Sequence, residues 1–205
     1  MWELMIKGGP VMYFLFICSV AGLYIIIQKV LYLKLNTVPN EYIIDKIKTN
    51  LITIGRDQTL KELRSERRLM LRVLATALKF STHSNEEIKD GIKEITYLEI
   101  PKLERNMNIL SSIITVAPIL GLLGTVLGLM NIFNVISGGN IGDAAALSSG
   151  IAQALITTVT GLTIAIPFIF LYQYLTHKID VFILDMERLM NDVLHFCNSH
   201  GGVKP

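Results

Sequence analysis

The sequence predicts an all-α integral membrane protein with three transmembrane helices and long helices that project into the cytoplasm. The main observation is the stretch of residues 106–177, in which Asp143 is the only charged side chain. About 20 apolar residues of helix cross a hydrocarbon core about 30 Å thick, so this stretch is long enough for two spans joined by a turn at residues 137–143. Composition agrees, because 51% of the 205 residues are hydrophobic and the charges are confined to blocks.

A further span is predicted near the N-terminus, at residues 10–32. Residues 8–28 carry no charge. The alternative is a cleaved signal peptide, because Lys7 precedes the apolar run and residues 19–21 form a small-residue cleavage site. The apolar run continues through Ile27 to full spanning length, which favours an uncleaved span.

Basic residues predict the orientation of the three spans. Lys and Arg lie beside the ends of the spans, whereas residues 137–149 contain neither. Basic residues are retained on the cytoplasmic side of membranes. The expected organisation is a periplasmic N-terminus 1–9, span 10–32, cytoplasmic helical segment 33–107, span 108–135, periplasmic turn 136–149, span 150–175, and cytoplasmic helix and tail 176–205.

The predicted cytoplasmic segments have amphipathic helical periodicity. Apolar residues recur every three or four positions over residues 60–78 and 179–194, as in helices that pack in a bundle. Ser84 and Glu87 form a capping box, and the helical pattern then continues into the second span with Pro101 as the expected kink. We therefore expect one long helix there. Four basic residues are interpreted as a solvated or inter-subunit face: Arg64, Arg67, Arg68 and Arg72.

No pattern in the sequence is typical of an enzyme, a metal centre or a nucleic-acid-binding protein. None of the 4 His residues accompanies a nucleophile or carboxylate motif, and Cys18 and Cys197 are expected to be unpaired packing residues. The 14 Lys and Arg of residues 34–105 are interleaved with 11 Asp and Glu, and the net charge is only +2. We expect no catalytic residue, no metal, no cofactor and no nucleic-acid partner.

Small and polar residues inside the second and third spans are the candidate functional residues. The Gly124–Gly128 spacing is typical of close helix packing, and the predicted packing residues are Gly121, Gly124, Gly128, Gly150 and Gly161. Two polar faces accompany them: Ser111, Thr115, Pro118 and Thr125 in the second span, and Ser149, Gln153, Thr157, Thr160 and Thr163 in the third. Their hydroxyls either bond to their own helices or line an aqueous or ion cavity between oligomerised subunits.

Two stretches resemble the signature spans of the ExbB/TolQ/MotA proton-channel family, and are nearer to ExbB and TolQ than to MotA: IPKLERNMNILSSIITVAPILGLLGTVLGLMNIF and GIAQALITTVTGLTIAIPFIFLYQYL. The resemblance implies a homopentamer in the bacterial inner membrane, whose second and third spans line a central pore. The pore would hold the helix of an ExbD- or TolR-like single-span protein with an intramembrane Asp. Protons driven by the proton-motive force would then move a TonB- or TolA-like periplasm-spanning protein, for outer-membrane transport or envelope maintenance.

The resemblance maps the pore threonines of the family onto Thr125 and Thr158, and the proline of its AP motif onto Pro118. Many ExbB and TolQ sequences have Glu where this chain has Gln153, so proton passage would depend on the partner's carboxylate, on hydroxyls and on water. Periodicity favours the face of Gln153 and Thr157, whereas Thr158 lies about 140° around the helix from Gln153. The candidate pore-lining residues are Thr125, Thr158, Gln153, Thr157, Thr115 and Pro118.

Two other functions are compatible with these patterns. A MotA-like flagellar stator belongs to the same family, although such chains have four spans and a larger charged cytoplasmic domain. A non-conducting membrane scaffold is the alternative from another class, and the absence of an ionisable side chain within the second and third spans supports it. The coupling ion could be H⁺ or Na⁺.

Overall fold

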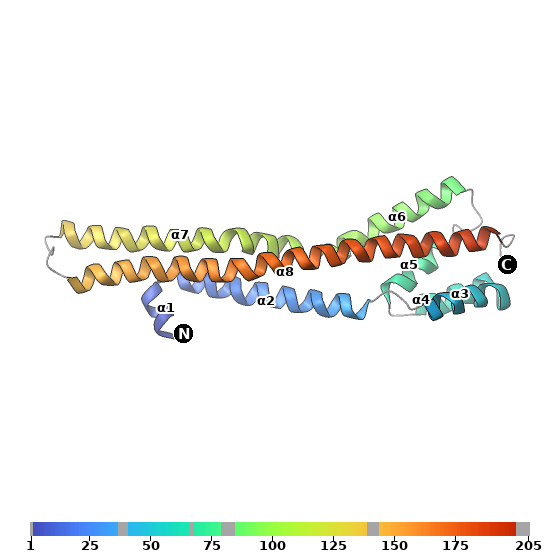
Figure 1. Cartoon of the computed structure of the whole chain (residues 1–205), viewed down its shortest axis with the longest axis horizontal. Helices are drawn as coiled ribbons and strands as arrows, with labels where there is room; N and C mark the ends of the chain where they lie inside the picture. Colours follow the sequence, from blue (N-terminus) through green and yellow to red (C-terminus); the bar gives the residue numbers. More distant parts are fainter. Residues whose placement is uncertain (1, 37–40, 66–67, 79–84, 139–143, 200–205) are drawn as a thin grey trace. The chain divides into compact units, whose positions relative to one another are not determined.

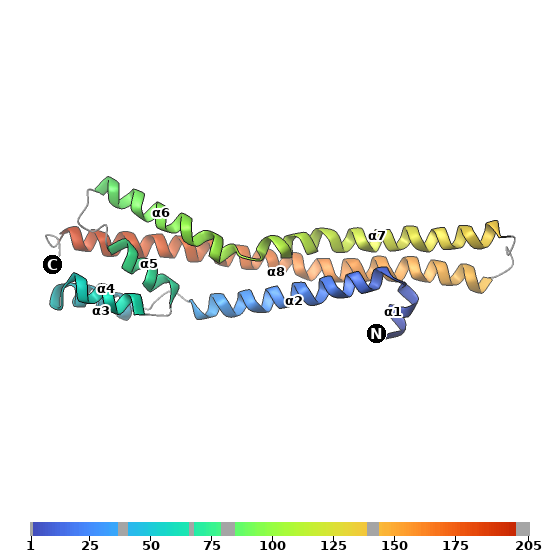
Figure 2. The same cartoon turned by 180° about the vertical axis from the view of Figure 1, so that it is seen from behind.

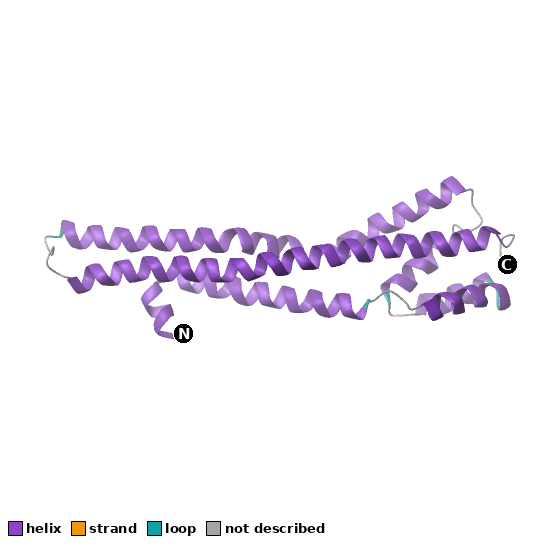
Figure 3. Cartoon of the chain, viewed as in Figure 1, coloured by secondary structure: helices purple, strands orange, loops and turns teal. Residues whose placement is uncertain are grey.

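The computed structural model describes residues 2–36, 41–65, 68–78, 85–138 and 144–199. Within these ranges the chain forms α-helices joined by short connections, and they contain no strand (Figures 1 and 3). This confirms the predicted all-α class. The helices are α1 (Trp2–Gly8), α2 (Val11–Leu35), α3 (Glu41–Thr53), α4 (Arg56–Ser65), α5 (Leu69–Ala77), α6 (Asn85–Glu104), α7 (Met107–Ser137) and α8 (Ala144–Ser199).

Three helices, α2, α7 and α8, are long and apolar enough to cross a membrane. They contain 25, 31 and 56 residues, and each exceeds the length of about 20 that a span requires. α8 begins at Ala144, inside the segment expected to be a turn, because it opens with three alanines, the strongest helix formers. It continues without interruption to Ser199, so the third expected span and the expected tail helix are one helix.

The chain divides into two compact units, which are described separately. The span unit contains Met1–Lys29 and Asn106–Leu175. The charged unit contains Val30–Arg105 and Thr176–Pro205. α2 and α8 contribute residues to both units.

In the span unit, α7 and the first part of α8 run side by side, and α2 packs along them (Figures 1 and 2). Val11, Met12 and Leu15 of α2 belong to one buried cluster with Ala117 of α7. Farther along α2, Gly22 lies so close to the ring of Phe168 on α8 that a Cβ there would clash with it. Small residues thus set the distances between helices in this unit.

The charged unit has an apolar core formed by α3, α4, α5, α6 and the last part of α8. The stripes at residues 60–78 and 179–194 supply most of its buried side chains, in agreement with their periodicity. Its wholly buried large side chains are Leu51, Met70, Leu74, Leu78, Leu103, Ile179, Met186, Met190 and Leu194.

The N-terminus of α5 is capped by a residue distant in sequence. Arg68 occupies the N-cap position and makes no side-chain hydrogen bond there. Instead, the backbone N–H of Leu69 donates to Oδ1 of Asn36, at 2.9 Å and buried. The Nδ2 of Asn36 donates to the carbonyl oxygen of Tyr32, at 2.9 Å. Asn36 therefore satisfies a helix N-terminus that lacks a local acceptor.

The expectation of one long helix leading into the second span is wrong. α6 ends at Glu104 and α7 begins at Met107. Between them Asn106 has a φ of 69°, a left-handed conformation that asparagine tolerates better than most residues. Its Nδ2 donates to Oε1 of Gln28, at 3.0 Å. Pro101, the expected kink, lies inside α6, and Ser84 of the expected capping box lies outside the described residues.

We predict that Asn36→Ala lowers the stability of the protein by about 1–3 kcal/mol, because the buried N–H of Leu69 loses its acceptor. The melting temperature of the purified protein in detergent measures the loss. Thr49→Ala is the control, because the exposed Thr49 hydroxyl only donates to Asp45 of its own helix. The control should stay within about 0.5 kcal/mol of the parent protein. Equal melting temperatures for the two variants would contradict the capping role.

Candidate functional site

The packing of α7 against α8 is a contact between backbones. A Cβ at Gly161 would lie 2.6 Å from the carbonyl oxygen of Ala117, and a Cβ at Gly128 would lie 2.7 Å from that of Gly150. A Cβ at Gly121 would lie 3.0 Å from the carbonyl oxygen of Thr157. Backbone atoms cannot move aside as a flexible side chain can, so this interface, here called the seam, requires small residues at these positions.

Gly124 and Thr157 meet at the middle of the seam. A Cβ at Gly124 would overlap the side chain of Thr157, which is wholly buried. The Thr157 hydroxyl donates to carbonyl oxygens of its own helix, at 3.1 Å to Gln153 and 3.0 Å to Ala154. Thr157 is therefore enclosed by its own chain, and its hydroxyl proton is donated within α8.

Thr158 makes the hydroxyl contact that crosses the seam. Its Oγ1 donates to the carbonyl oxygen of Gly121 on α7, at 3.2 Å. The other threonines of residues 107–137 and 144–175 donate to carbonyls of their own helices. They are Thr115, Thr125, Thr157, Thr160 and Thr163. Bonding within the helix was one of the two alternatives that the sequence left open; the other was the lining of a cavity between subunits.

The carbonyl that Thr158 contacts lies close to the proline of α7. Pro118 has no N–H, so the carbonyl of Ile114, one turn earlier, lacks its usual helical donor. Gly121 lies 3 residues after Pro118, and its carbonyl receives the Thr158 hydroxyl. Thr125 is partly exposed one turn farther on, and its hydroxyl donates to Leu122 at 2.6 Å. This part of the seam therefore combines hydroxyls with backbone acceptors inside apolar helices.

Gln153 lies where three segments of the chain meet. Its Oε1 accepts a hydrogen bond from Nδ2 of Asn131 on α7, at 3.1 Å. Its Nε2 lies against the turn between α1 and α2, where a Cβ at Gly9 would be 2.5 Å away. Gly9 has a φ of +72°, which favours glycine. Sequence reasoning did not single out Asn131 or Gly9, although an amide in an apolar run is itself a signal.

The six candidate pore residues therefore have different surroundings. Thr157 is buried in the seam, Thr158 bridges it, and Gln153 contacts α7 and the first turn. Pro118 and Thr125 are half-buried, and Thr115 is exposed on α7, where its hydroxyl donates to Ser111 at 3.1 Å. Neither α7 nor residues 144–175 contain Asp, Glu, His, Lys or Arg. Hydroxyls and amides can donate and accept hydrogen bonds there, but they do not titrate at neutral pH.

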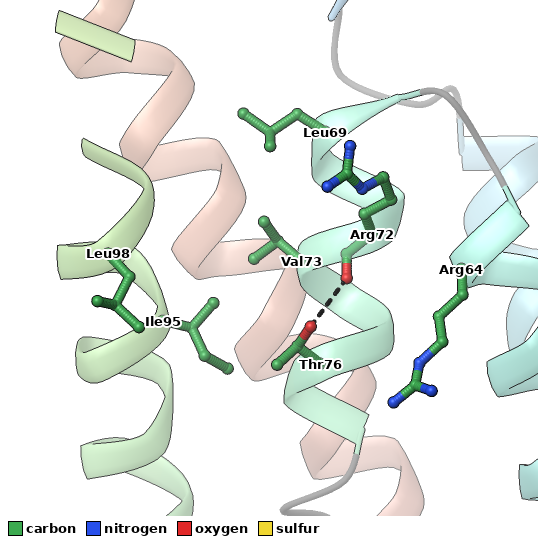
Figure 4. A pocket seen from close by; sticks show the side chains of 7 residues that line it. All are labelled: Arg64, Leu69, Arg72, Val73, Thr76, Ile95 and Leu98. Atoms are coloured by element: carbon green, nitrogen blue, oxygen red, sulfur yellow. Dashed lines mark hydrogen bonds between the residues drawn. The ribbon is translucent and has the colours of Figure 1, made fainter. Parts of the chain in front are cut away.

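The basic residues of the charged unit border two hollows in its surface. One, of about 190 Å³, is lined by Arg64 and Arg72 together with apolar residues of α5 and α6 (Figure 4). Arg68 borders the other, of about 280 Å³, together with Glu62 and Lys46. Arg67 lies outside the described residues. Arg64, Arg68 and Arg72 thus lie at the surface, which agrees with the expected solvated or inter-subunit face.

The cysteines and the acidic residues show no reactive arrangement in the described part of the chain. Both cysteines are unpaired. Burial raises the pKa of the Cys197 thiol, and the charge of Arg56 only partly opposes it, so the thiol form is favoured. Among the described residues, no three His, Cys, Asp or Glu side chains gather in a way that could hold a metal ion.

Comparison with known proteins matches these features to one family. The model of the MotA/TolQ/ExbB proton channel family matches residues 62–188. A biopolymer transport ExbB homolog of Methanothermobacter thermautotrophicus is 32% identical over 179 residues, which are 87% of this chain and 63% of that protein. The Tol-Pal system protein TolQ of Haemophilus influenzae is 34% identical over 100 residues, 47% of this chain and 44% of that protein. This chain therefore spans less than two thirds of the length of these relatives.

An all-helical fold with three apolar spans defines an integral membrane protein, and the glycine seam with its hydroxyls is typical of tightly packed membrane helices. The chain belongs to the MotA/TolQ/ExbB proton channel family. The predicted resemblance to this family is thereby confirmed. Its members are transport channel proteins rather than enzymes, as the sequence predicted.

We predict that Gly161→Ala destabilises the protein by about 1–3 kcal/mol, because its Cβ would lie 2.6 Å from a backbone oxygen of α7. Gly138→Ala is the matched control, since Gly138 ends α7 with an ordinary φ of −75°. Thermal unfolding in detergent should show a loss for Gly161→Ala and almost none for the control. A melting curve of Gly161→Ala that overlies the parent curve would show that the seam is looser than these contacts indicate.

Proposed function

We propose that this chain is the ExbB/TolQ-type inner-membrane subunit of a motor driven by the proton-motive force. The observation that carries the proposal is the Thr158 hydroxyl, which reaches the Gly121 carbonyl beside Pro118 in spans that lack any charged side chain. Such a site can lower the cost of a charge or proton brought by another molecule. It has no group of its own that stores a proton.

A second protein is needed to supply the titrating group. We infer an ExbD- or TolR-like partner with one span and an intramembrane Asp. A lone carboxylate at mid-membrane costs at least about 2.5–3.5 kcal/mol, so its helix requires a polar surface within the bilayer. A membrane potential of 100 mV supplies about 2.3 kcal/mol for each charge moved, which is enough to bias the position of such a helix. A TonB- or TolA-like periplasm-spanning protein would receive the motion.

The outward faces of α7 and α8 are available for contacts with other copies of the chain. Apolar side chains of both helices are exposed in the single chain, among them Leu122 at 63% and Val159 at 62%. Lipid and neighbouring copies can both cover such surfaces. We propose a homopentamer in which copies of these two helices surround the partner helix. Its candidate pore-lining residues are Thr125, Thr158, Thr115 and Pro118, with Thr157 and Gln153 inside the contacts of each subunit.

The distribution of charges supports one membrane orientation. The charged unit, including residues 33–105, would lie in the cytoplasm with the C-terminus, because its Lys and Arg flank the spans. The N-terminus and the connection between α7 and α8 would then face the periplasm.

We predict that Thr158→Ala and Thr125→Ala each abolish partner-dependent proton flux and leave assembly intact. Flux is measured in proteoliposomes that contain the chain and its single-span partner, under an imposed potential. Thr163→Ala is the matched control, because it removes the same hydroxyl from an exposed position of α8 that is not among the candidate pore-lining residues. The control should conduct as the parent does. Parental flux in both Thr158→Ala and Thr125→Ala would refute the assignment of these residues.

The second candidate function is a scaffold without conduction, which the absence of charged residues in α7 and residues 144–175 favours. Co-purification under mild detergent separates the two functions. Recovery of the chain with a small single-span protein that carries an intramembrane Asp is the expected result. Recovery of the chain alone, as a bundle without a foreign helix, would support the scaffold and contradict the motor.

A further inference from the structure

The amide residues of the span unit lie at two levels along α7. At one end Asn106 donates to Gln28 of α2, at 3.0 Å. At the other end Asn131 donates to Gln153 of α8, at 3.1 Å. Between residues 109 and 130, α7 has no charged or amide side chain. At 1.5 Å per residue, the two asparagines are about 37 Å apart, slightly more than the thickness of a hydrocarbon core.

The apolar stretches of the other two spans also end at polar residues. On α8, no charged or amide side chain lies between Gln153 and Gln173, a distance of about 30 Å along the helix. On α2, the apolar residues extend from Val11, just after Gly9, to Ile27, just before Gln28. Gly9 lies against Gln153, so the polar limit of α2 coincides with that of α8. The three helices therefore share one polar boundary at the end where α7 and α8 are connected.

We propose that Gln153, Asn131 and the turn at Gly9 form a clasp in the headgroup layer, and that Gln153 is a positioning residue which holds the first span against α7 and α8. Gln153 is suited to this role because its amide has both an acceptor and donors. Its Oε1 accepts from Asn131, and its Nε2 faces Gly9. The proposal does not depend on the ion conducted or on the partner protein.

The residues beside the clasp show what it holds in place. Gly8 is buried, and a Cβ there would lie 3.4 Å from Ile156 on α8. Val11, the first residue of α2, is only 3% exposed. Gly9 has a positive φ at the turn between α1 and α2 and leaves no room for a side chain beside Nε2 of Gln153. Loss of the clasp would therefore expose Val11 to water before it affects the distant part of α2.

The test uses a single thiol as a reporter. In a Cys18→Ser, Cys197→Ala background, Val11→Cys is reacted with a membrane-impermeant maleimide in nanodiscs, which leave both membrane faces accessible. Gln153→Leu and Asn131→Leu should each raise the labelling rate by at least about threefold, the change expected from a hydrogen bond of average strength between membrane helices. Thr163→Val is the matched control and should leave the rate unchanged.

Rescue distinguishes the clasp from a general loss of packing. The exchanged pair, Asn131→Gln with Gln153→Asn, retains two amides of the same combined length and should restore slow labelling. Asn131 is exposed, so Asn131→Leu serves as a second variant if Gln153→Leu does not fold. Labelling of Asn131→Leu at the rate of the Thr163→Val control would overturn the proposal, as would an exchanged pair labelled as fast as the single variants.

Discussion

The contact between the backbones of α7 and α8 is the constraint on which the span unit depends. Helices in a membrane gain little from burying apolar side chains against each other, because lipid is equally apolar. Close approach of the backbones replaces that driving force, and it requires the absence of side chains at Gly121, Gly128 and Gly161. The same approach brings the hydroxyl of Thr158 within reach of a carbonyl on the other helix. Packing and polar chemistry in this unit thus have one cause.

The threonine hydroxyls of the two spans differ in which helix accepts their hydrogen bond. Five of the six threonines in α7 and residues 144–175 donate to carbonyls of their own helix, which satisfies them without a neighbour. Thr158 alone among these six bonds across the seam. Its acceptor, the Gly121 carbonyl, lies one turn after Pro118, whereas the carbonyl that Pro118 leaves without a helical donor is that of Ile114, one turn before the proline.

Composition and periodicity were sufficient to predict the class of the fold and its three spans, since both depend on local sequence. The glycines that the sequence indicated as packing residues lie in the seam, because their spacing within each helix places them on one face. The break at Asn106 was not predicted from local sequence, and the side-chain partner of Asn106 there, Gln28, lies 78 positions away. Periodicity groups Gln153 with Thr157, but it cannot say that Thr158 is the residue opposite Gly121. That pairing depends on the register of two antiparallel helices, which no single segment encodes.

The hydrogen bond between Asn36 and Leu69 has a consequence for biogenesis. Asn36 directly follows α2, and it precedes Leu69 by 33 residues. During synthesis this acceptor leaves the ribosome well before the helix that it caps. Once α2 is in the bilayer, Asn36 lies at the end of that span before Leu69 has been synthesised. The end of the first span thus carries the acceptor for a helix that is synthesised later, and this contact links the insertion of α2 to the folding of α5.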